Sequence, residues 1–262
     1  MRIALTIAGS DSGGGAGIQA DLKTFQRFGV FGTSALTAIT AQNTQGVSRW
    51  EAVSPDLVRA QIDSVAEDLP PAAFKSGMLA SSSIASVVAS SIREHSLPNY
   101  VLDPVMVATS GDVLLESDAI EVIRRELIPL AFLVTPNVHE AAILTGAAID
   151  DEDAMARAAE TIVSDMGAQA VLIKGGHINS GNRVVDILYD GNVRAFRTER
   201  LDARNTHGTG CSLSAAITAQ LATGESLHAA VRRAIDYVHN AIATAPGLGS
   251  GHGPLNHLAD NS

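Results

Sequence analysis

Residues 205–211, with the sequence Asn-Thr-His-Gly-Thr-Gly-Cys, combine an anion-binding pattern with a nucleophilic side chain. Gly208 and Gly210 let the backbone bend so that successive N–H groups converge, and the apolar stretch 212–222 is typical of a helix whose N-terminus backs such a turn. The thiol of Cys211 would then lie beside a bound phosphate. The alternative is a glycine-rich strand-to-helix turn followed by an inert cysteine. We favour a phosphate-handling enzyme.

Other charged side chains follow expected strands. Lys174, which precedes two glycines, places an ammonium where it can meet a phosphate. Asn137 and Glu140 have the spacing of a capping box at the start of a helix. A carboxylate there also suits Mg²⁺, which proteins hold through one or two carboxylates plus waters and substrate phosphates, and Asp103 could supply the second. Helix cap and metal ligand stay open as interpretations of Glu140.

The glycine-rich loop 9–17 follows the first expected strand. It lacks the Gly-Lys-Ser/Thr ending of a P-loop and does not fit the dinucleotide-binding spacing. The loop is therefore either a flexible turn or a ligand-lining segment, and Asp11 and Asp21 could contact a ligand or cap a helix. The eight histidines show no metal-ligand spacing, so no zinc site is expected. His207 could contact nucleotide, although an exposed loop position is the commoner case.

The amino-acid composition argues against nucleic acid and membranes as binding partners. The chain of 262 residues has a net charge of -10 and only 4% aromatic residues, which argues against nucleic-acid binding. A single cysteine excludes an internal disulfide, and charges interrupt every candidate membrane span. Met1 and Arg2 lead straight into an apolar strand rather than a cleavable signal. We expect a cytoplasmic protein with no membrane or nucleic-acid partner.

Alternating apolar runs and amphipathic stretches predict an α/β fold with a mainly parallel sheet, helices on both faces and an antiparallel hairpin at one edge. No linker divides the chain, so one domain, 1–262, is expected. Ligands bind beyond the carboxyl ends of such strands, where the polar residues above fall. The expected strands are 3–8, 34–41, 74–76, 99–102, 132–135, 170–174, 184–189 and 193–198, and the expected helices are 16–28, 55–68, 81–95, 117–127, 137–144, 151–166, 213–222 and 226–244, with a loop at 246–254.

Several motifs together resemble the hydroxymethylpyrimidine/phosphomethylpyrimidine kinases of thiamine biosynthesis. The resemblance implies a ribokinase-like three-layer fold, ATP and Mg²⁺, a homodimer, and two successive phosphorylations of 4-amino-5-hydroxymethyl-2-methylpyrimidine. The motifs are Ala-Gly-Ser-Asp-Ser-Gly-Gly-Gly-Ala-Gly-Ile-Gln-Ala-Asp-Leu-Lys-Thr-Phe (8–25), Thr-Ala-Ile-Thr-Ala-Gln-Asn-Thr-Gln-Gly-Val (37–47), Lys-Ser-Gly-Met-Leu (75–79), Asp-Pro-Val-Met (103–106), Thr-Pro-Asn (135–137), Lys-Gly-Gly-His (174–177) and the segment 205–211.

The resemblance also implies roles for individual residues. Gln42 matches the pyrimidine-binding glutamine, whose amide accepts from the 4-amino group and donates to the neighbouring ring nitrogen, as glutamine does on adenine. The other implied pyrimidine-pocket residues are Gly9, Ala16, Asp21, Met78 and Val105. The implied ATP-binding residues are Lys174, Asn137, Thr209 and Gly208, and the implied Mg²⁺ ligands are Asp103 and Glu140.

Cys211 matches the proposed base for the substrate hydroxyl. We expect the helix N-terminus to lower its pKa, so that thiolate exists at neutral pH. The amides of Gly208 and Gly210, with Lys174, would stabilise charge on the transferred phosphoryl group.

Two alternatives remain. Pyridoxal kinase belongs to the same superfamily and also phosphorylates a hydroxymethyl group on a six-membered nitrogen ring, but pyridoxal has no exocyclic amine for Gln42 to pair with. Phosphorylation of pyridoxal as a side activity also stays open. A non-catalytic pyrimidine-binding module would retain the fold, but the presence of Asp103, Glu140, Lys174 and Cys211 argues against it.

Overall fold

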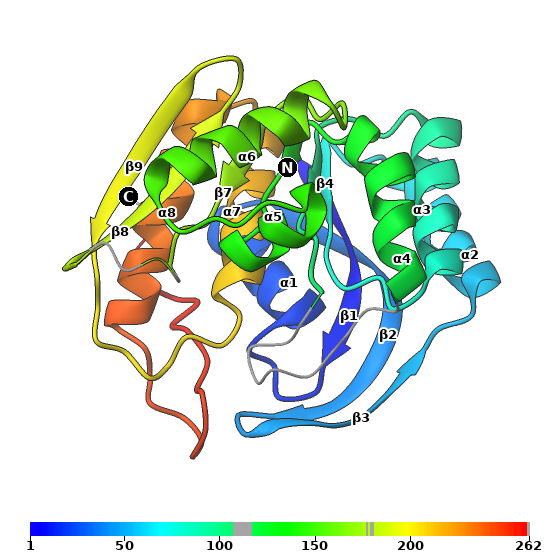
Figure 1. Ribbon diagram of the computed structural model, residues 1–262. Helices are drawn as coiled ribbons and strands as arrows, with labels where there is room; N and C mark the ends of the chain where they lie inside the picture. Colours follow the sequence, from blue (N-terminus) through cyan, green and yellow to red (C-terminus); the bar gives the residue numbers. More distant parts are fainter. Residues whose placement is uncertain (107–116, 177, 179–180, 261–262) are drawn as a thin grey trace.

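The computed structural model describes residues 1–106, 117–176, 178 and 181–260, and the motif residue His177 lies outside them. In this part of the chain, nine strands form one sheet in the order β3-β2-β1-β4-β5-β6-β7-β8-β9 (Figure 1). The strands are β1 (Ile3–Asp11), β2 (Phe31–Asn43), β3 (Gly46–Ala52), β4 (Ala73–Ser76), β5 (Tyr100–Leu102), β6 (Leu133–Val134), β7 (Val171–Ile173), β8 (Arg183–Tyr189) and β9 (Val193–Glu199).

The six central strands, from β2 to β7, are parallel, and the strands at both edges are antiparallel. This confirms the predicted α/β class and the β8–β9 hairpin, whose turn contains Gly191 at φ +96°. β3 was not predicted. Because none of its residues is buried, the segment lacks the apolar alternation by which a strand is recognised, and only pairing with β2 defines it.

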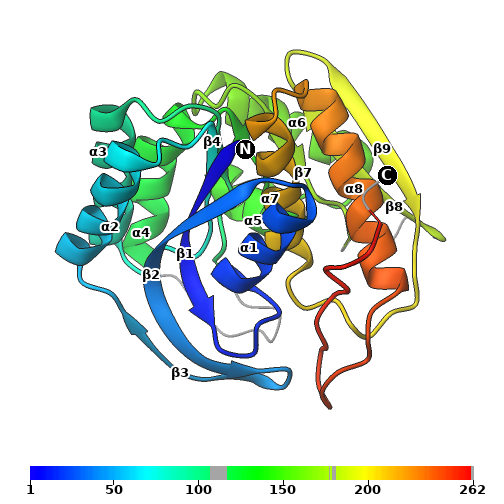
Figure 2. The ribbon, with the colours of Figure 1, turned by 180° about the vertical axis from the view of Figure 1, so that it is seen from behind.

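Helices cover both faces of the sheet and make three layers (Figures 1 and 2). One core contains side chains of α2, α3, α5 and α6, and the other contains side chains of α1, α7 and α8. Side chains along β1 alternate between the two cores: Leu5 and Ile7 belong to the first core, and Ala4 belongs to the second. The helices are α1 (Gly17–Arg27), α2 (Pro55–Asp68), α3 (Ser82–His95), α4 (Ser117–Val122), α5 (Val138–Thr145), α6 (Glu152–Ser164), α7 (Thr209–Ala222) and α8 (Leu227–Ala243).

The helix expected over 117–127 is shorter than predicted. After α4 the chain continues as a wider π-helical turn, Ile123–Leu127, and a 3₁₀ turn, Ile128–Leu130. Pro129 has no N–H to donate to a carbonyl of the preceding turn, so the regular α-helical hydrogen-bond ladder cannot continue through it. None of the helices in the described ranges is both long and apolar enough to cross a membrane.

The expected loop 246–254 joins two other loops at the carboxyl end of the sheet. His252 N–H donates to the carbonyl of Thr44 in the β2–β3 turn at 2.7 Å, and His207 N–H donates to the carbonyl of Gly253 at 3.2 Å. A Cβ at Gly251 would lie 1.8 Å from the Thr44 carbonyl oxygen, so only glycine fits. The C-terminal segment therefore ties the end of β2 to the turn that precedes α7.

Candidate active site

A cavity of about 760 Å³ lies at the carboxyl ends of the parallel strands, a volume that suits a small ligand. Its walls contain residues at or just after the ends of β1, β2, β4, β5, β6 and β7, together with the turn that opens α7. All but one of the residues expected at the site lie in these walls: Gly9, Ala16, Gln42, Met78, Val105, Asp103, Asn137, Glu140, Lys174, Gly208, Thr209, Gly210 and Cys211.

Asp21 is the exception, and its expected contact with the pyrimidine is corrected. Its carboxylate is 0% exposed inside the protein, where it accepts hydrogen bonds from Lys75 Nζ at 2.9 Å and Thr6 Oγ1 at 2.6 Å. Burial opposes charge on Lys75, but the nearby Asp21 carboxylate raises the pKa of Lys75 above its usual value. Asp21 and Lys75 thus form a structural ion pair behind the cavity.

The 205–211 turn has the backbone bend that its glycines predict. Gly208 has φ +83°, and a Cβ there would lie 1.8 Å from the carbonyl oxygen of Gly15 in the first glycine-rich loop. The helix begins at Thr209, earlier than expected, and its first hydrogen bond runs from Ser212 N–H to the Gly208 carbonyl at 2.8 Å. The N–H groups of Gly210 and Cys211 thus belong to the first turn of α7, where they point toward the positive end of the helix dipole.

Lys174 and Asp103 form an ion pair beside this turn. Lys174 Nζ lies 3.0 Å from Asp103 Oδ1, and a Cβ built on Gly210 would lie 3.3 Å from the same Nζ. Although burial opposes it, Lys174 holds the pKa of Asp103 below its usual range, and Asp103 in turn raises the pKa of Lys174. Both groups are therefore charged at neutral pH. The Lys174 side chain is 16% exposed, so its ammonium stays open to a phosphate in the cavity.

The capping box at the start of α5 is confirmed. Asn137 Oδ1 accepts from Glu140 N–H at 2.9 Å, and Glu140 Oε2 accepts from Asn137 N–H at 2.8 Å. Burial raises the pKa of Glu140, Lys174 opposes that shift, and Asp103 adds to it. Two carboxylates that share a cavity and sense each other's charge fit an ion held partly by waters and phosphates. The described residues contain no cluster of three or more acidic, histidine or cysteine side chains for a metal, so Mg²⁺ ligation by Asp103 and Glu140 stays a prediction.

The expected low pKa of Cys211 is wrong for the ligand-free protein. Burial raises the pKa of the thiol to about 11; Lys75 and the Gly17 N–H oppose that shift, whereas the Asp21 and Asp103 carboxylates add to it. Loss of hydration around the thiol is the largest of these effects. At neutral pH Cys211 is therefore a neutral thiol.

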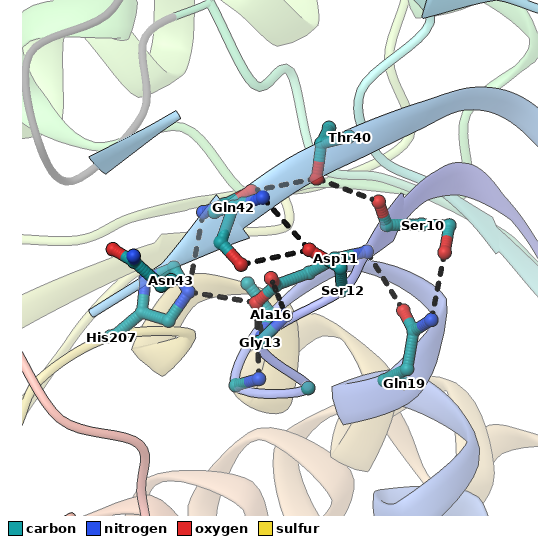
Figure 3. Close-up of polar contacts among 12 residues, drawn as sticks. Ser10, Asp11, Ser12, Gly13, Ala16, Gln19, Thr40, Gln42, Asn43 and His207 are labelled. Atoms are coloured by element: carbon teal, nitrogen blue, oxygen red, sulfur yellow. Dashed lines mark hydrogen bonds and ion pairs between the residues drawn. The ribbon is translucent and has the colours of Figure 1, made fainter. Parts of the chain in front are cut away.

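Two further residues, Asp11 and His207, pair with each other in the wall of the cavity (Figure 3). The Asp11 carboxylate accepts from the N–H groups of Gly13, Gly15 and Ala16 at 2.7, 3.0 and 2.8 Å, and it lies 2.9 Å from His207 Nε2. His207 is buried, against the exposed position expected for a loop histidine. Sequence spacing could not reveal this pair, because the two loops meet only in the folded protein.

Asp186, on β8, is another wall residue that the sequence did not indicate. Its carboxylate accepts from the Gly175 N–H at 2.9 Å, and burial raises its pKa to about 6 despite that hydrogen bond. A Cβ at Gly175 would lie 1.9 Å from the carbonyl oxygen of Val185, so the Lys174–Gly175 segment packs tightly against β8. Asp186 therefore supports the backbone next to Lys174.

The parallel sheet between two helical layers, with a glycine turn and a lysine beside a cavity at its carboxyl end, defines a small-molecule kinase of the ribokinase-like class. The chain belongs to the phosphomethylpyrimidine kinase family, whose model matches residues 11–256.

Individual relatives agree with this family. A hydroxymethylpyrimidine/phosphomethylpyrimidine kinase of Rhizobium meliloti is 52% identical over 260 residues, which cover 98% of this chain and 97% of the relative. A solved phosphomethylpyrimidine kinase of Clostridium difficile is 42% identical with a TM-score of 0.82, covering 92% of this chain and 100% of its own. A pyridoxal kinase of Bacillus subtilis, solved as an ADP complex, is 40% identical with a TM-score of 0.91, covering 99% and 98%.

Proposed function

We propose that this chain transfers the terminal phosphoryl group of ATP to 4-amino-5-hydroxymethyl-2-methylpyrimidine and then to the resulting monophosphate, within thiamine biosynthesis. One observation carries the proposal. The Gln42 amide, which can pair with an aminopyrimidine, shares a cavity with Lys174 and the Gly208–Gly210 turn, which can bind phosphate. The second phosphorylation makes a diphosphate, a good leaving group for joining the pyrimidine to another ring.

The acceptor end of the cavity lies between β1, β2 and the residues after β4 and β5. Gln42 lies at the end of β2, and Met78 and Val105 offer apolar surface for the ring and its methyl group. A Cβ at Gly9 would lie 3.1 Å from Met78 Sδ, so a larger residue there would displace the Met78 side chain. These residues form a pocket for a flat, partly apolar ring.

The phosphate end is built from charge and backbone N–H groups. Lys174 and the amides at the start of α7 would stabilise negative charge on the phosphoryl group in transfer, and Asn137 and Thr209, which line the same cavity, would contact the nucleotide. Mg²⁺, when bound, would be held by Asp103 and Glu140 and would neutralise charge on the ATP phosphates. These roles follow from shared placement in one cavity.

The two phosphoryl acceptors differ in whether they need a base such as Cys211. The first is an alcohol, which must lose a proton as it attacks, whereas the second is a phosphate monoester that is already largely ionised at pH 7. We assign the Cys211 thiolate as the base of the first step. The second step does not require it.

The test is an ATP-turnover assay of the purified protein with hydroxymethylpyrimidine, its monophosphate and pyridoxal in parallel, with products followed by mass. Two phosphates on the pyrimidine are expected. Turnover with pyridoxal alone would overturn the proposal in favour of pyridoxal kinase, a candidate favoured by the similarity to the Bacillus subtilis structure. ATP hydrolysis that ignores all three compounds would also overturn it.

We further propose that the enzyme is a cytoplasmic homodimer. β3 is an edge strand: β2 pairs with one side of it, and no strand of the described residues pairs with the other side. Ile39 on β2 is 57% exposed, so this edge of the sheet can accept a second copy of the chain. Light scattering at micromolar concentration should give twice the mass of one chain. A single-chain mass would contradict the dimer.

A further inference from the structure

We propose that Thr40 and His207 hold the Gln42 amide in one of its two orientations and thereby determine which way the pyrimidine ring lies in the cavity. This role rests on the kinase activity proposed above. Thr40 lies two residues before Gln42 on β2, and His207 lies on the turn that carries Cys211 (Figure 3). Thr40 approaches the Gln42 amide from the same strand, and His207 approaches it from the turn before α7.

The contacts form a short chain. Thr40 Oγ1 lies 2.9 Å from the carbonyl oxygen of Ser10 and 3.2 Å from one terminal atom of the Gln42 amide. His207 Nε2 lies 2.9 Å from Asp11 Oδ2 and 3.4 Å from the other terminal atom. This series of contacts ends on one side at the Ser10 carbonyl and on the other at the Asp11 carboxylate, and both groups can only accept hydrogen bonds.

The number of hydrogens available at each partner then assigns the orientation of the Gln42 amide. The Thr40 hydroxyl has one hydrogen, which the Ser10 carbonyl takes, so Thr40 Oγ1 must accept from the amide. Three backbone N–H groups and His207 keep the pKa of Asp11 below its usual value although burial opposes this, so the carboxylate is ionised and His207 Nε2 carries a hydrogen. The amide NH₂ of Gln42 therefore faces Thr40, and its oxygen faces His207.

This orientation is the reverse of placing Oε1 next to Thr40. The hydrogen count at Thr40 requires it, and His207 agrees with it, because the single Nε2–H, which is donated to Asp11 at 2.9 Å, repels an N–H and attracts an oxygen 3.4 Å away. In the reversed amide, two N–H donors would meet at His207, and two oxygens without a hydrogen between them would meet at Thr40. The two orientations of the Gln42 amide occupy the same volume, so only the hydrogen-bond partners decide between them. The second amide hydrogen and the second lone pair remain for a ligand.

The fixed orientation of the Gln42 amide determines the orientation of the pyrimidine ring. The ring nitrogen must meet the NH₂ on the Thr40 side, and the exocyclic amine must meet the oxygen on the His207 side. Because the hydroxymethyl group is next to the amine on the ring, it lies further along the same direction, toward the turn that bears Cys211. A reversed amide would pair with a ring turned over, with its hydroxymethyl group directed away from that turn.

The test uses Thr40→Val, which removes the hydroxyl and keeps the side-chain shape. Thr33→Val is the matched control, because Thr33 also lies on β2 and donates to a β1 carbonyl, Ala4, at 3.1 Å, but far along the strand from Gln42. Thr40→Ser restores the hydroxyl. The two substrates are hydroxymethylpyrimidine and the analogue with a 4-oxo group, whose ring N–H donates and whose oxygen accepts, the reverse order.

The wild-type enzyme is expected to prefer the amino compound by at least about 100-fold in kcat/KM, because the oxo compound leaves buried polar groups unpaired. Thr40→Val should reduce this preference about tenfold and raise KM for the amino compound about fivefold, with KM for ATP unchanged. Thr40→Ser and Thr33→Val should keep the wild-type ratio. A Thr40→Val ratio equal to that of wild type, or an equal drop in Thr33→Val, would overturn the role of Thr40. If wild type phosphorylates neither pyrimidine, the proposed function fails instead.

Discussion

Asp11 and His207 are 196 positions apart in the sequence, yet Asp11 Oδ2 and His207 Nε2 lie 2.9 Å apart in the wall of the cavity. The same carboxylate accepts from three N–H groups of the loop that follows β1. One side chain thus holds that loop in shape and fastens it to the turn before α7. The two glycine-rich segments of the sequence form a single wall.

Replacing Asp11 by alanine should therefore disturb stability and substrate binding together. We expect a loss of about 2–3 kcal/mol in the free energy of unfolding, because buried N–H groups lose a charged acceptor, and at least a tenfold rise in KM for the pyrimidine. Urea unfolding and steady-state kinetics measure the two effects. Asp151→Ala removes the cap of α6, at 2.7 Å from the Ala154 N–H, and should lower stability by about 1 kcal/mol with KM unchanged. Unchanged KM in Asp11→Ala would contradict the shared wall.

Cys211→Ala should slow phosphorylation of the alcohol by about 10²-fold and affect phosphorylation of the monophosphate much less, because only the alcohol needs a base. Quenched assays that start from each acceptor separate the two steps. Ser212→Ala, whose hydroxyl lies 3.3 Å from His257 Nε2 rather than in the cavity wall, is the matched control and should leave both rates within about twofold. Equal losses in the two steps would remove Cys211 as the base.

The raised pKa of Cys211 also predicts a pH profile. Burial raises the pKa of the thiol to about 11, so the thiolate, which is the active form of the base, grows about tenfold per pH unit below that value. The rate of the first step should rise with this slope between about pH 7 and pH 9, and the second step should stay nearly flat over the same range. A first step that is flat with pH in the wild-type enzyme would contradict a thiolate base.

Asp186→Asn should stabilise the protein at neutral pH. Because burial raises the pKa of Asp186 to about 6, the folded state keeps a proton that the unfolded state loses from about pH 4, and stability falls as pH rises from about 4 to 6. Asparagine keeps an acceptor for the Gly175 N–H at this position without a buried charge. Urea unfolding should show a gain of about 1–3 kcal/mol at pH 7 that disappears below about pH 4. Asp68→Asn, at the exposed end of α2, should show no such gain, and a gain for Asp186→Asn that is independent of pH would refute the explanation.

The buried Asp21–Lys75 pair should behave as structure rather than as substrate contact. Lys75→Met leaves the Asp21 carboxylate buried without its cation and should destabilise the fold by about 3–5 kcal/mol. Adding Asp21→Leu to Lys75→Met should recover part of that loss, because the unpaired charge is gone. A double-mutant cycle in urea measures the coupling. Additive losses would show that the two side chains do not depend on each other.

The sequence alone determined the features that depend on neighbours along the chain. Helix α2 was predicted with its observed bounds, Pro55–Asp68, because Ser54 and Pro55 mark its start, and the Asn137–Glu140 capping box was read from spacing. Alternation of apolar runs predicted a parallel sheet, and polar residues after the strands marked the edge where the cavity lies. Periods, caps and turns are local, so a single sequence carries them.

The tertiary structure decided what depends on distant partners and on hydration. β3 forms only because β2 offers it hydrogen bonds, and Asp21 is buried outside the cavity walls because it pairs with Lys75. The pKa of Cys211 rises rather than falls because the folded protein removes water from around the thiol and places carboxylates nearby. The orientation of Gln42 depends on Thr40 and His207 together. Desolvation and long-range contacts arise only when remote segments pack, and no local pattern in a sequence records them.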